Sequence, residues 1–212
     1  AYDLVSSVDN LFQFRSVQIA RDIYRQPLPC RLILPLYRES LCDRLFWPQF
    51  LEFMAHNDDL TDQVYFAADQ SLLEDLDRVE RAHLQGLIDR DFRLALTGAA
   101  DLDFDLAALR RQNVRLVLLP TPMFPDGVTS AGAPYPATDF ARLIDRHGMT
   151  LIIDDLQSED DLLKVMDNGG QYGAGPLFGG YRPLGDDLLA KILPRGTQAP
   201  SAQASSAHAT GA

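Results

Sequence analysis

The residues best suited to chemistry in this chain are two adjacent aspartates, Asp154 and Asp155. They directly follow the apolar residues 151–153, which predict a short buried strand. In α/β folds the loops at the carboxyl ends of the strands form the ligand sites. Two carboxylates at such an end would suit general acid and base catalysis in a barrel enzyme, or they could order the loop and cap the next helix.

A helix is expected to begin just beyond this acidic pair. Ser158 is followed three residues later by Asp161, a spacing typical of a capping box at a helix start. Glu159 and Asp160 add negative charge to the first turn, where the helix dipole is positive. A Gly- and Pro-rich return completes the stretch 151–183, so polar groups gather at the exit of one strand and around the segment that follows it.

The other acidic residues and the histidines form no recognisable catalytic or metal-binding motif. Asp101, Asp103 and Asp105 alternate as in a calcium loop, but the glycine and the closing glutamate of an EF-hand are absent, which favours a loop-to-helix entry. No Ser, Cys or Lys stands in a nucleophile motif such as G-x-S-x-G. Surface or helix-end roles are expected for the unpaired histidines His56, His83, His147 and His208. We therefore expect neither a metal site nor a cofactor.

Charge and composition exclude several classes of function. The 212 residues, 46% of them hydrophobic, are enough for one substantial domain. The formal net charge of −11 argues against nucleic acid or anionic lipid as the main partner, because both require a concentrated Lys/Arg face. No run of about 18 apolar residues exists, so we expect no membrane contact from this segment. Cys30 and Cys42 lack metal-ligand spacing, and we expect reduced thiols packed in the core of a cytoplasmic protein.

Hydrophobic periodicity predicts alternating strands and helices. Pro35 should end or bulge the first strand, and the aromatic face of the second helix is expected to lie in the core. The predicted strands are 31–37, 64–68, 92–96, 114–119 and 151–153, with a further candidate at 172–178. The predicted helices are 4–24, 41–55, 72–88, 106–112, 138–147, 160–166 and 184–192.

The repetition of strand and helix predicts parallel pairing, in a (β/α) barrel or in an open doubly wound sheet. No Gly-rich phosphate loop follows any strand, so we favour the barrel. The barrel domain is expected to span residues 1–194, whereas residues 195–212 are small and polar and indicate a disordered tail. Because the first residues already fit a helix, we expect the C-terminal part of a longer protein, with any membrane anchor upstream.

The order of these segments resembles the EAL domain, a family of cyclic-di-GMP phosphodiesterases named for a Glu-Ala-Leu signature. Residues 150–184, TLIIDDLQSEDDLLKVMDNGGQYGAGPLFGGYRPL, are similar to the closing third of that domain. Within them, 153–158 fit the I-A-E-G-V-E-T strand end, and 174–178 with Pro183 fit the Q-G-Y-x-F-x-x-P return. Earlier segments are similar to the family's asparagine-bearing, acidic, Asp-Asp-Phe-Gly-Thr-Gly and Lys-Ile-Asp stretches, at 32–41, 64–70, 94–109 and 116–124.

The resemblance implies a TIM-like (β/α) barrel of the EAL type, whose active members hold two divalent metal ions with carboxylates, an asparagine and a glutamine. Most matching positions differ here: the family's asparagine, glutamate, two aspartates, lysine, aspartate and glutamine correspond to Pro35, Ala67, Thr97, Gly98, Leu118, Pro120 and Ala174. Asp154 keeps a carboxylate at the place of a glutamate, and Gln157 replaces a second one. Loss of a general base alone costs about 10²- to 10⁴-fold in rate, so we expect a degenerate domain that is not an enzyme. The Glu-Ala-Leu segment itself would precede Ala1.

Three functions remain open at this point. The first is a cyclic-di-GMP receptor in bacterial signalling, as in the degenerate TipF type of flagellar-assembly regulator that the resemblance suggests. The second is a protein-interaction scaffold that binds no nucleotide, because the expected strand ends are apolar or acidic. The third and most remote is an active phosphodiesterase or another barrel hydrolase. For a bound nucleotide, the expected contacts are Arg38, Arg115, Asp154, Gln157, Phe178, Arg182 and Pro183.

Two expectations concern assembly. Protein partners and a homodimer are expected to use residues 120–136, because Met123, Phe124 and Tyr135 make this excursion apolar for a free loop. A barrel of this type takes about 250 residues, with about 200 as the lower end. The chain without its tail is at or below that length. We therefore predict a barrel that lacks its first strand, with the gap exposed, closed by a shifted element or filled by a neighbouring molecule.

Overall fold

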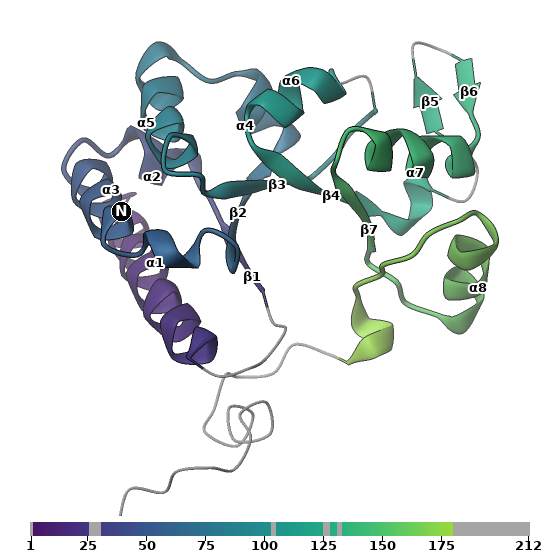
Figure 1. Ribbon diagram of the computed structural model, residues 1–212, viewed down its shortest axis with the longest axis horizontal. Coiled ribbons are helices and arrows are strands. Elements are labelled where there is room, and N and C mark those ends of the chain that lie inside the picture. Colours follow the sequence, from purple (N-terminus) through teal and green to yellow (C-terminus); the bar gives the residue numbers. More distant parts are fainter. Residues whose placement is uncertain (1, 26–30, 103–104, 125–127, 131–132, 180–212) are drawn as a thin grey trace, which may run out of the picture. The chain divides into compact units, whose positions relative to one another are not determined.

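Five parallel strands form the central sheet of the computed structural model, which describes residues 2–25, 31–102, 105–124, 128–130 and 133–179 (Figure 1). The strands are β1 (Leu32–Pro35), β2 (Val64–Asp69), β3 (Arg93–Thr97), β4 (Val114–Pro120) and β7 (Thr150–Asp154). They pair in sequence order, β1-β2-β3-β4-β7, so each new strand is added on the same side of the sheet. A doubly wound sheet would reverse direction at some point. The expected partial (β/α) barrel is therefore confirmed.

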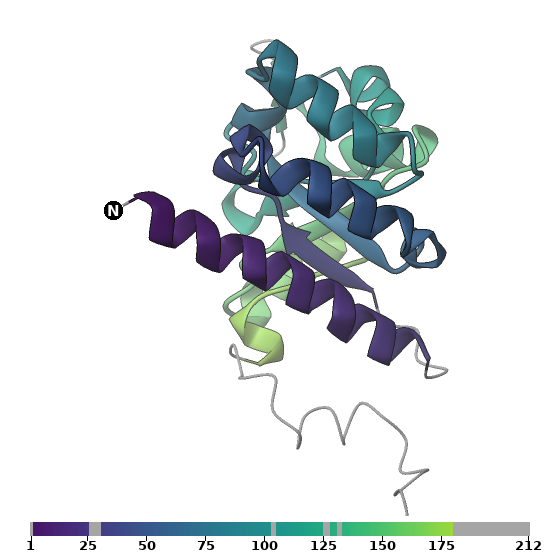
Figure 2. The same ribbon diagram turned by 90° about the vertical axis from the view of Figure 1, so that its left-hand side faces the viewer.

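Helices fill the connections between these strands, as parallel pairing requires. They are α1 (Tyr2–Tyr24), α2 (Arg38–Cys42), α3 (Phe46–Ala55), α4 (Gln70–Glu74), α5 (Arg78–Ile88), α6 (Leu106–Arg111), α7 (Ala137–Arg146) and α8 (Glu159–Asp167). Short 3₁₀ turns lie at η1 (Asp58–Leu60), η2 (Thr121–Met123) and η3 (Pro176–Phe178). Figure 2 shows α1, α3 and α5 following one another along the outside of the sheet.

Two of the predicted helices are each divided in two by a capping aspartate. Asp43 accepts hydrogen bonds from the N–H groups of Phe46 and Leu45, each at 2.9 Å, and these donors lower the pKa of its carboxyl below the usual value. It thereby separates α2 from α3 within the predicted helix 41–55. Asp77 forms a complete capping box with Glu80 and starts α5 within the predicted helix 72–88. Local side-chain bonds thus interrupt a continuous hydrophobic pattern.

Four further predictions need correction or fall outside the described residues. The excursion 120–136 contains an antiparallel hairpin of β5 (Val128–Ser130) and β6 (Ala133–Tyr135), which the sequence did not reveal. The candidate strand 172–178 is wrong, since it reduces to one bridge between Gly173 and Ile153 followed by the 3₁₀ turn η3. The predicted helix 184–192 and the tail 195–212 lie outside the described residues.

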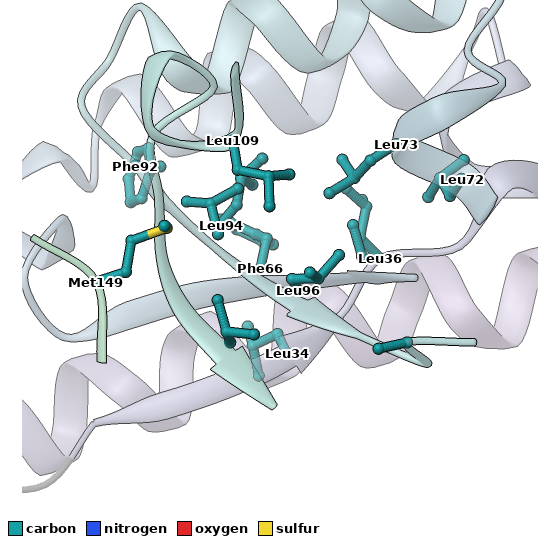
Figure 3. Close-up of a cluster of buried hydrophobic side chains, with 14 of the residues drawn as sticks. Leu34, Leu36, Phe66, Leu72, Leu73, Phe92, Leu94, Leu96, Leu109 and Met149 are labelled. Atoms are coloured by element: carbon teal, nitrogen blue, oxygen red, sulfur yellow. The ribbon is translucent and has the colours of Figure 1, made fainter. Parts of the chain in front are cut away.

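The main hydrophobic core lies between the outer face of the sheet and the helices (Figure 3). Its largest members are aromatic, as the pattern of the second predicted helix indicated. Phe50 on α3 meets Phe66 on β2 edge to face at 5.9 Å, and Phe66 meets Phe92 in the same way at 5.9 Å. Trp47 is fully buried and donates a hydrogen bond from its indole N–H to the His83 carbonyl. This core fixes the helices on the sheet.

The inner face of the sheet has a separate, smaller cluster, because side chains alternate between the two faces of a strand. Tyr65, Ala95 and Leu116 are buried there, with Ala67, Leu118 and Ile152 packed against them. All six come from strands, and no helix of the described residues contributes to this cluster. The inner face is therefore apolar along its middle.

Two residues lie in environments that differ from those expected. Cys42 was predicted in the core but is exposed, and its thiol donates to Glu80 at 3.1 Å. Partial burial and that acidic neighbour raise the pKa of Cys42 to about 11, so the thiol stays protonated at neutral pH. Phe124 was predicted in a contact surface but is fully buried and belongs to the core. Cys30 lies outside the described residues.

Among the described helices, none combines the length and the apolar character that crossing a membrane requires.

Candidate functional site

The carboxyl ends of the five strands meet at one edge of the sheet, which we call the carboxyl edge. Its residues are Pro35, Asp69, Thr97, Pro120 and Asp154, one from the end of each strand. The strand register pairs Asp69 with Thr97 and Pro120 with Asp154. Because loops at this edge form the ligand sites of α/β barrels, the carboxyl edge is the candidate site.

Asp69 is a second acidic residue at this edge, which sequence reasoning missed. Its Oδ1 atom accepts a hydrogen bond from the Thr97 hydroxyl at 2.8 Å. Gly98 follows in a left-handed conformation, φ +56°, and a Cβ atom there would lie only 2.9 Å from the same oxygen. The predicted strand ended at Ala68, one residue too early. The alternation of Tyr65, Ala67 and Asp69 on one face was the signal that could have revealed it.

Gln70 holds the loop after β3 against the start of α4. Its side chain is buried, and its amide nitrogen donates to Glu74 Oε1 at 2.8 Å and to Asp101 Oδ1 at 2.9 Å. Its amide oxygen accepts from the Ala100 N–H at 3.0 Å. A single glutamine therefore connects two successive strand ends through their loops. Sequence reasoning did not single out this residue.

We expect Gln70→Leu to loosen the loop after β3. The variant removes the four hydrogen bonds of the Gln70 side chain and deprives the Ala100 N–H and the Asp101 carboxylate of this buried partner, at a cost of about 1–3 kcal/mol. Amide hydrogen exchange at Ala100 should quicken by about tenfold or more. Gln85→Leu is the matched control, since Gln85 on α5 makes an exposed bond to Asp89 at the C-terminal end of that helix. Equal exchange at Ala100 in both variants would show that Gln70 does not hold the loop.

The two aspartates that follow β7 are bound into a tight turn. Asp154 Oδ1 accepts from the Asp155 N–H at 2.8 Å, and the Asp154 carbonyl accepts from the Thr121 hydroxyl at 2.6 Å. Asp155 has the left-handed φ of +61°. The Gln157 amide donates to both oxygens of the Asp155 carboxylate at 3.2 Å. This geometry favours the loop-ordering role over a paired acid and base.

The return segment 172–178 then lies beside the end of β7. Ile153 donates its N–H to Tyr172 and accepts from Ala174, at 2.9 and 2.8 Å. Leu156 donates to the Ala174 carbonyl at 2.9 Å and accepts from Leu177 at 3.0 Å. These backbone bonds place Phe178 at the end of the segment with 59% of its surface exposed.

The residues predicted to bind a ligand do not all gather at the carboxyl edge. Three of them lie close to the end of β7, namely Asp154, Gln157 and Phe178. Arg38 instead faces the helical layer, where it donates to the Asp75 carbonyl at 2.8 Å and pairs with the buried Glu80 at 3.5 Å. Arg115 lies near the start of β4 and donates to the carbonyls of Val114 and Arg110, at the opposite end of the strand. Arg182 and Pro183 lie outside the described residues.

The carboxyl edge, as far as the structure describes it, groups few of the oxygen ligands that a two-metal centre requires. Hard divalent cations require several oxygen ligands at once. Ala67 and Leu118, which correspond to a glutamate and a lysine in the resemblance, pack into the apolar inner cluster, and Pro35 ends β1. Over the described ranges, no three His, Cys, Asp or Glu side chains are grouped to hold a metal ion.

Asp105, His56 and His147 stand at helix ends, whereas His83 lies within α5. Asp105 caps α6 by accepting from the Ala108 N–H at 3.0 Å, and that bond lowers the pKa of its carboxyl. His56 and His147 stand at the C-terminal ends of α3 and α7. His83 bonds to the Leu41 carbonyl at 2.7 Å. Asp103 and His208 lie outside the described residues.

Comparisons with known proteins identify the fold. No protein-family model matches this chain, and no curated protein does. Among solved structures, the Xanthomonas citri FimX EAL domain in complex with cyclic-di-GMP is 14% identical, with a TM-score of 0.66 over 86% of this chain and 72% of that one. The Pseudomonas aeruginosa FimX EAL domain bound to cyclic-di-GMP is 13% identical, with a TM-score of 0.60 over 82% and 69%.

A third neighbour is a longer protein. The Bacillus subtilis YkuI protein, which has an EAL domain and was solved with cyclic-di-GMP and calcium, is 13% identical, with a TM-score of 0.61 over 85% of this chain. The chain spans 43% of the length of YkuI. At these identities the likeness concerns the fold, and the resemblance to EAL domains is confirmed at that level.

Proposed function

We propose that this chain, whose fold is that of EAL domains, binds cyclic-di-GMP at its carboxyl edge and acts as a receptor that does not hydrolyse the nucleotide. The FimX and YkuI structures contain cyclic-di-GMP, and this proposal extends that ligand to a chain of the same fold. A role in bacterial signalling, for example in the control of motility, is part of the proposal. The proposal rests on the side chains of the carboxyl edge, where the Asp69 and Asp154 carboxylates accept hydrogen bonds from neighbouring residues.

The polar groups of the carboxyl edge are engaged with one another, which argues for binding without turnover. The Asp69 carboxylate accepts from Thr97, and the Asp154 carboxylate accepts from the Asp155 N–H. The side chains on the inner face beside them, Ala67 and Leu118, are apolar. Phosphodiester hydrolysis by two metals requires the metals to activate water and to stabilise the leaving oxygen. The described part of this edge groups few oxygen ligands for such metals, which supports binding without turnover.

Two exposed aromatic rings and several carboxylates suit recognition of the guanine bases. Phe178 is 59% exposed after β7, and Tyr37 is 42% exposed just after β1. Stacking of a base on an aromatic ring contributes about 1–3 kcal/mol. The N1–H and N2–H donors of guanine match a carboxylate, which accepts two parallel hydrogen bonds. Asp154 or Asp155 could offer those acceptors after a local rearrangement of the turn.

Isothermal titration of the 212-residue chain with cyclic-di-GMP tests this proposal. Micromolar or tighter binding is expected, and Phe178→Ala should weaken it by about tenfold or more through the loss of one stacked base. Phe12→Ala on α1 is the matched control, since Phe12 is also half exposed but lies on another element. Heat changes that are absent at hundreds of micromolar would overturn the receptor proposal.

A hydrolysis assay separates a receptor from an enzyme. With Mg²⁺ or Mn²⁺ present, cyclic-di-GMP incubated with the chain should stay intact. Product formation that Asp154→Ala abolishes would contradict the non-hydrolytic part of the proposal.

A protein-interaction scaffold is the second candidate, and the surface of α1 favours it. Val8, Leu11 and Phe12 are 63%, 69% and 50% exposed, at the i, i+3 and i+4 spacing of one helix face. Apolar side chains grouped in this way are typical of protein contacts, including contacts between copies of one chain. Calorimetric silence towards cyclic-di-GMP, together with self-association that Leu11→Asp abolishes, would favour this candidate over the receptor.

A further inference from the structure

A cleft of about 340 Å³ lies away from the carboxyl edge, beside the first half of β7. One wall is a face of α7 with Thr138, Ala141, Arg142 and Asp145, which follow the i, i+3, i+4, i+7 spacing of a helix. The other wall is the segment 169–172, and Leu151 on β7 contributes to the floor. Every residue that lines the cleft is among those the structure describes. We call it the α7 cleft.

The backbone of Leu151 faces this cleft without a partner strand. In a parallel ladder, alternate residues direct their N–H and C=O groups to opposite neighbours. Ile153 bonds to Tyr172 and Ala174 on the side away from β4, so Leu151, two residues earlier, also points away from β4. Among the described residues, no backbone group pairs with Leu151 on that side. Backbone N–H and C=O groups in a folded protein are usually paired, so the N–H and C=O of Leu151 remain available to pair with a bound chain.

The end of α8 is the reason why the ladder stops. Gly169 donates its N–H to Met166, and Gly170 donates to Val165, the bond pattern of a Schellman motif. Gly169 has the positive φ of +85° that this motif requires. A Cβ atom at Gly170 would lie 2.4 Å from a Val165 side-chain atom, so the close turn also requires glycine there. The cap holds residues 169–170 against α8 instead of beside Leu151.

The size and polarity of the cleft match an extended peptide. The eight residues of α7 from Thr138 to Asp145 span about 10 Å, since each of the seven steps between them rises 1.5 Å. About three residues of extended chain have the same length. Thr138, Arg142 and Asp145 offer a donor and acceptor, a cation and an anion along that wall. A ligand with alternating N–H and C=O groups could form hydrogen bonds both with the backbone of Leu151 and with these side chains of α7.

We propose that the α7 cleft binds an extended peptide segment of about three residues, which continues the sheet by pairing its backbone with the N–H and C=O of Leu151. The segment would take the place of the missing part of the strand at 169–171 and run parallel to β7. Main-chain pairing provides affinity in this mode of recognition, and the side walls provide selectivity. The site is separate from the carboxyl edge, because Asp154 stands at the other end of β7.

Nuclear magnetic resonance of the ¹⁵N-labelled 212-residue chain tests this site with a defined probe, N-acetyl-trialaninamide. Titration to millimolar concentrations should give saturable shifts of the Leu151 and Tyr172 amides and slow the hydrogen exchange of Leu151. Ala141→Phe, which fills the cleft, should weaken binding by about tenfold or more. Ala108→Phe is the matched control, because Ala108 is a partly buried alanine on α6.

A modified probe keeps the test independent of protein folding. The same peptide with every amide nitrogen fully methylated, the terminal carboxamide included, cannot donate a hydrogen bond to the Leu151 carbonyl. It should leave the Leu151 and Tyr172 amides unshifted. Equal shifts with both peptides, or no saturable shift with the unmodified one, would overturn the proposal.

Discussion

Replacing Phe50 with alanine is expected to lower the free energy of unfolding by about 3–5 kcal/mol, the range for an aromatic residue in a core. Phe50 is fully buried on α3. Its ring contacts those of Phe46, Trp47 and Phe66 at centroid distances of 5.3, 5.6 and 5.9 Å. Removing it leaves a cavity where the α3 layer meets β2, and rigid aromatic neighbours cannot collapse into that space. Domains are stable by only about 5–15 kcal/mol, so the variant would be close to unfolding.

Urea denaturation followed by circular dichroism measures this loss. Phe12→Ala is the control, since the same side chain is removed where it is 50% exposed, and its effect should be near 0.5 kcal/mol or less. Similar losses in the two variants would show that the aromatic cluster does not dominate the core. Because Phe12 lies on the exposed apolar face of α1, the Phe12→Ala variant also shows whether removing a ring from that face affects stability.

Replacing Gly175 with alanine is expected to detach the return segment from β7. Gly175 has φ +143° and ψ 178°, a conformation that is essentially limited to glycine. An added Cβ atom would lie 2.3 Å from the Leu156 nitrogen and 2.6 Å from its carbonyl oxygen, both backbone atoms that cannot move aside easily. The hydrogen bond from Leu156 to Ala174 and the one from Leu177 to Leu156 would then be lost. We expect a loss of about 2–4 kcal/mol from strain and lost bonds together.

Gly179→Ala is the matched control for this variant. Gly179 also has a positive φ, +126°, but no atom of the described residues lies within 4 Å of the Cβ position. It should therefore show only the backbone cost of about 1–3 kcal/mol, without the clash. Hydrogen exchange at the Leu156 amide distinguishes the two, because only Gly175→Ala should accelerate it. Unchanged protection of Leu156 in Gly175→Ala would contradict the packing described here.

This variant also bears on the proposed function. The return segment positions Phe178, and the cyclic-di-GMP affinity should fall in Gly175→Ala if the ring stacks on a base. Affinity that is unchanged while Leu156 loses its protection would place the nucleotide site elsewhere on the carboxyl edge.

Several elements follow directly from local chemistry. The capping signal at Ser158 is present, since its hydroxyl oxygen accepts from the Asp161 N–H at 3.1 Å and α8 begins at the next residue. Pro35 ends β1, as a residue without an N–H donor should. The five main strands were predicted because continuous apolar runs are typical of strands buried on both faces. Such signals depend on a few neighbouring residues, so they can be recognised from the sequence.

Other features required contacts between distant residues. Asp69 belongs to the carboxyl edge because the register of β2 with β3 places it beside Thr97, 28 residues later. The turn at Asp154 depends on a hydroxyl 33 residues away, on Thr121. Arg38 is directed by the buried Glu80, and Arg115 by the carbonyl groups of Arg110 near the end of α6 and of Val114 at the start of β4. No periodicity in the sequence encodes these pairings.

The sequence by itself therefore determined the order of strands and helices, the barrel type of the fold and the acidic end of β7, because local hydrogen bonding and hydrophobic burial specify them. The tertiary structure alone decided which polar groups share the carboxyl edge, how Asp154 and Asp155 are engaged, and where the α7 cleft opens. Each of these depends on strand register and on the packing of α8, which bring together residues that are far apart in the chain. The positions of the site's side chains depend on that packing, whereas the strands and helices that carry them are specified by short stretches of sequence.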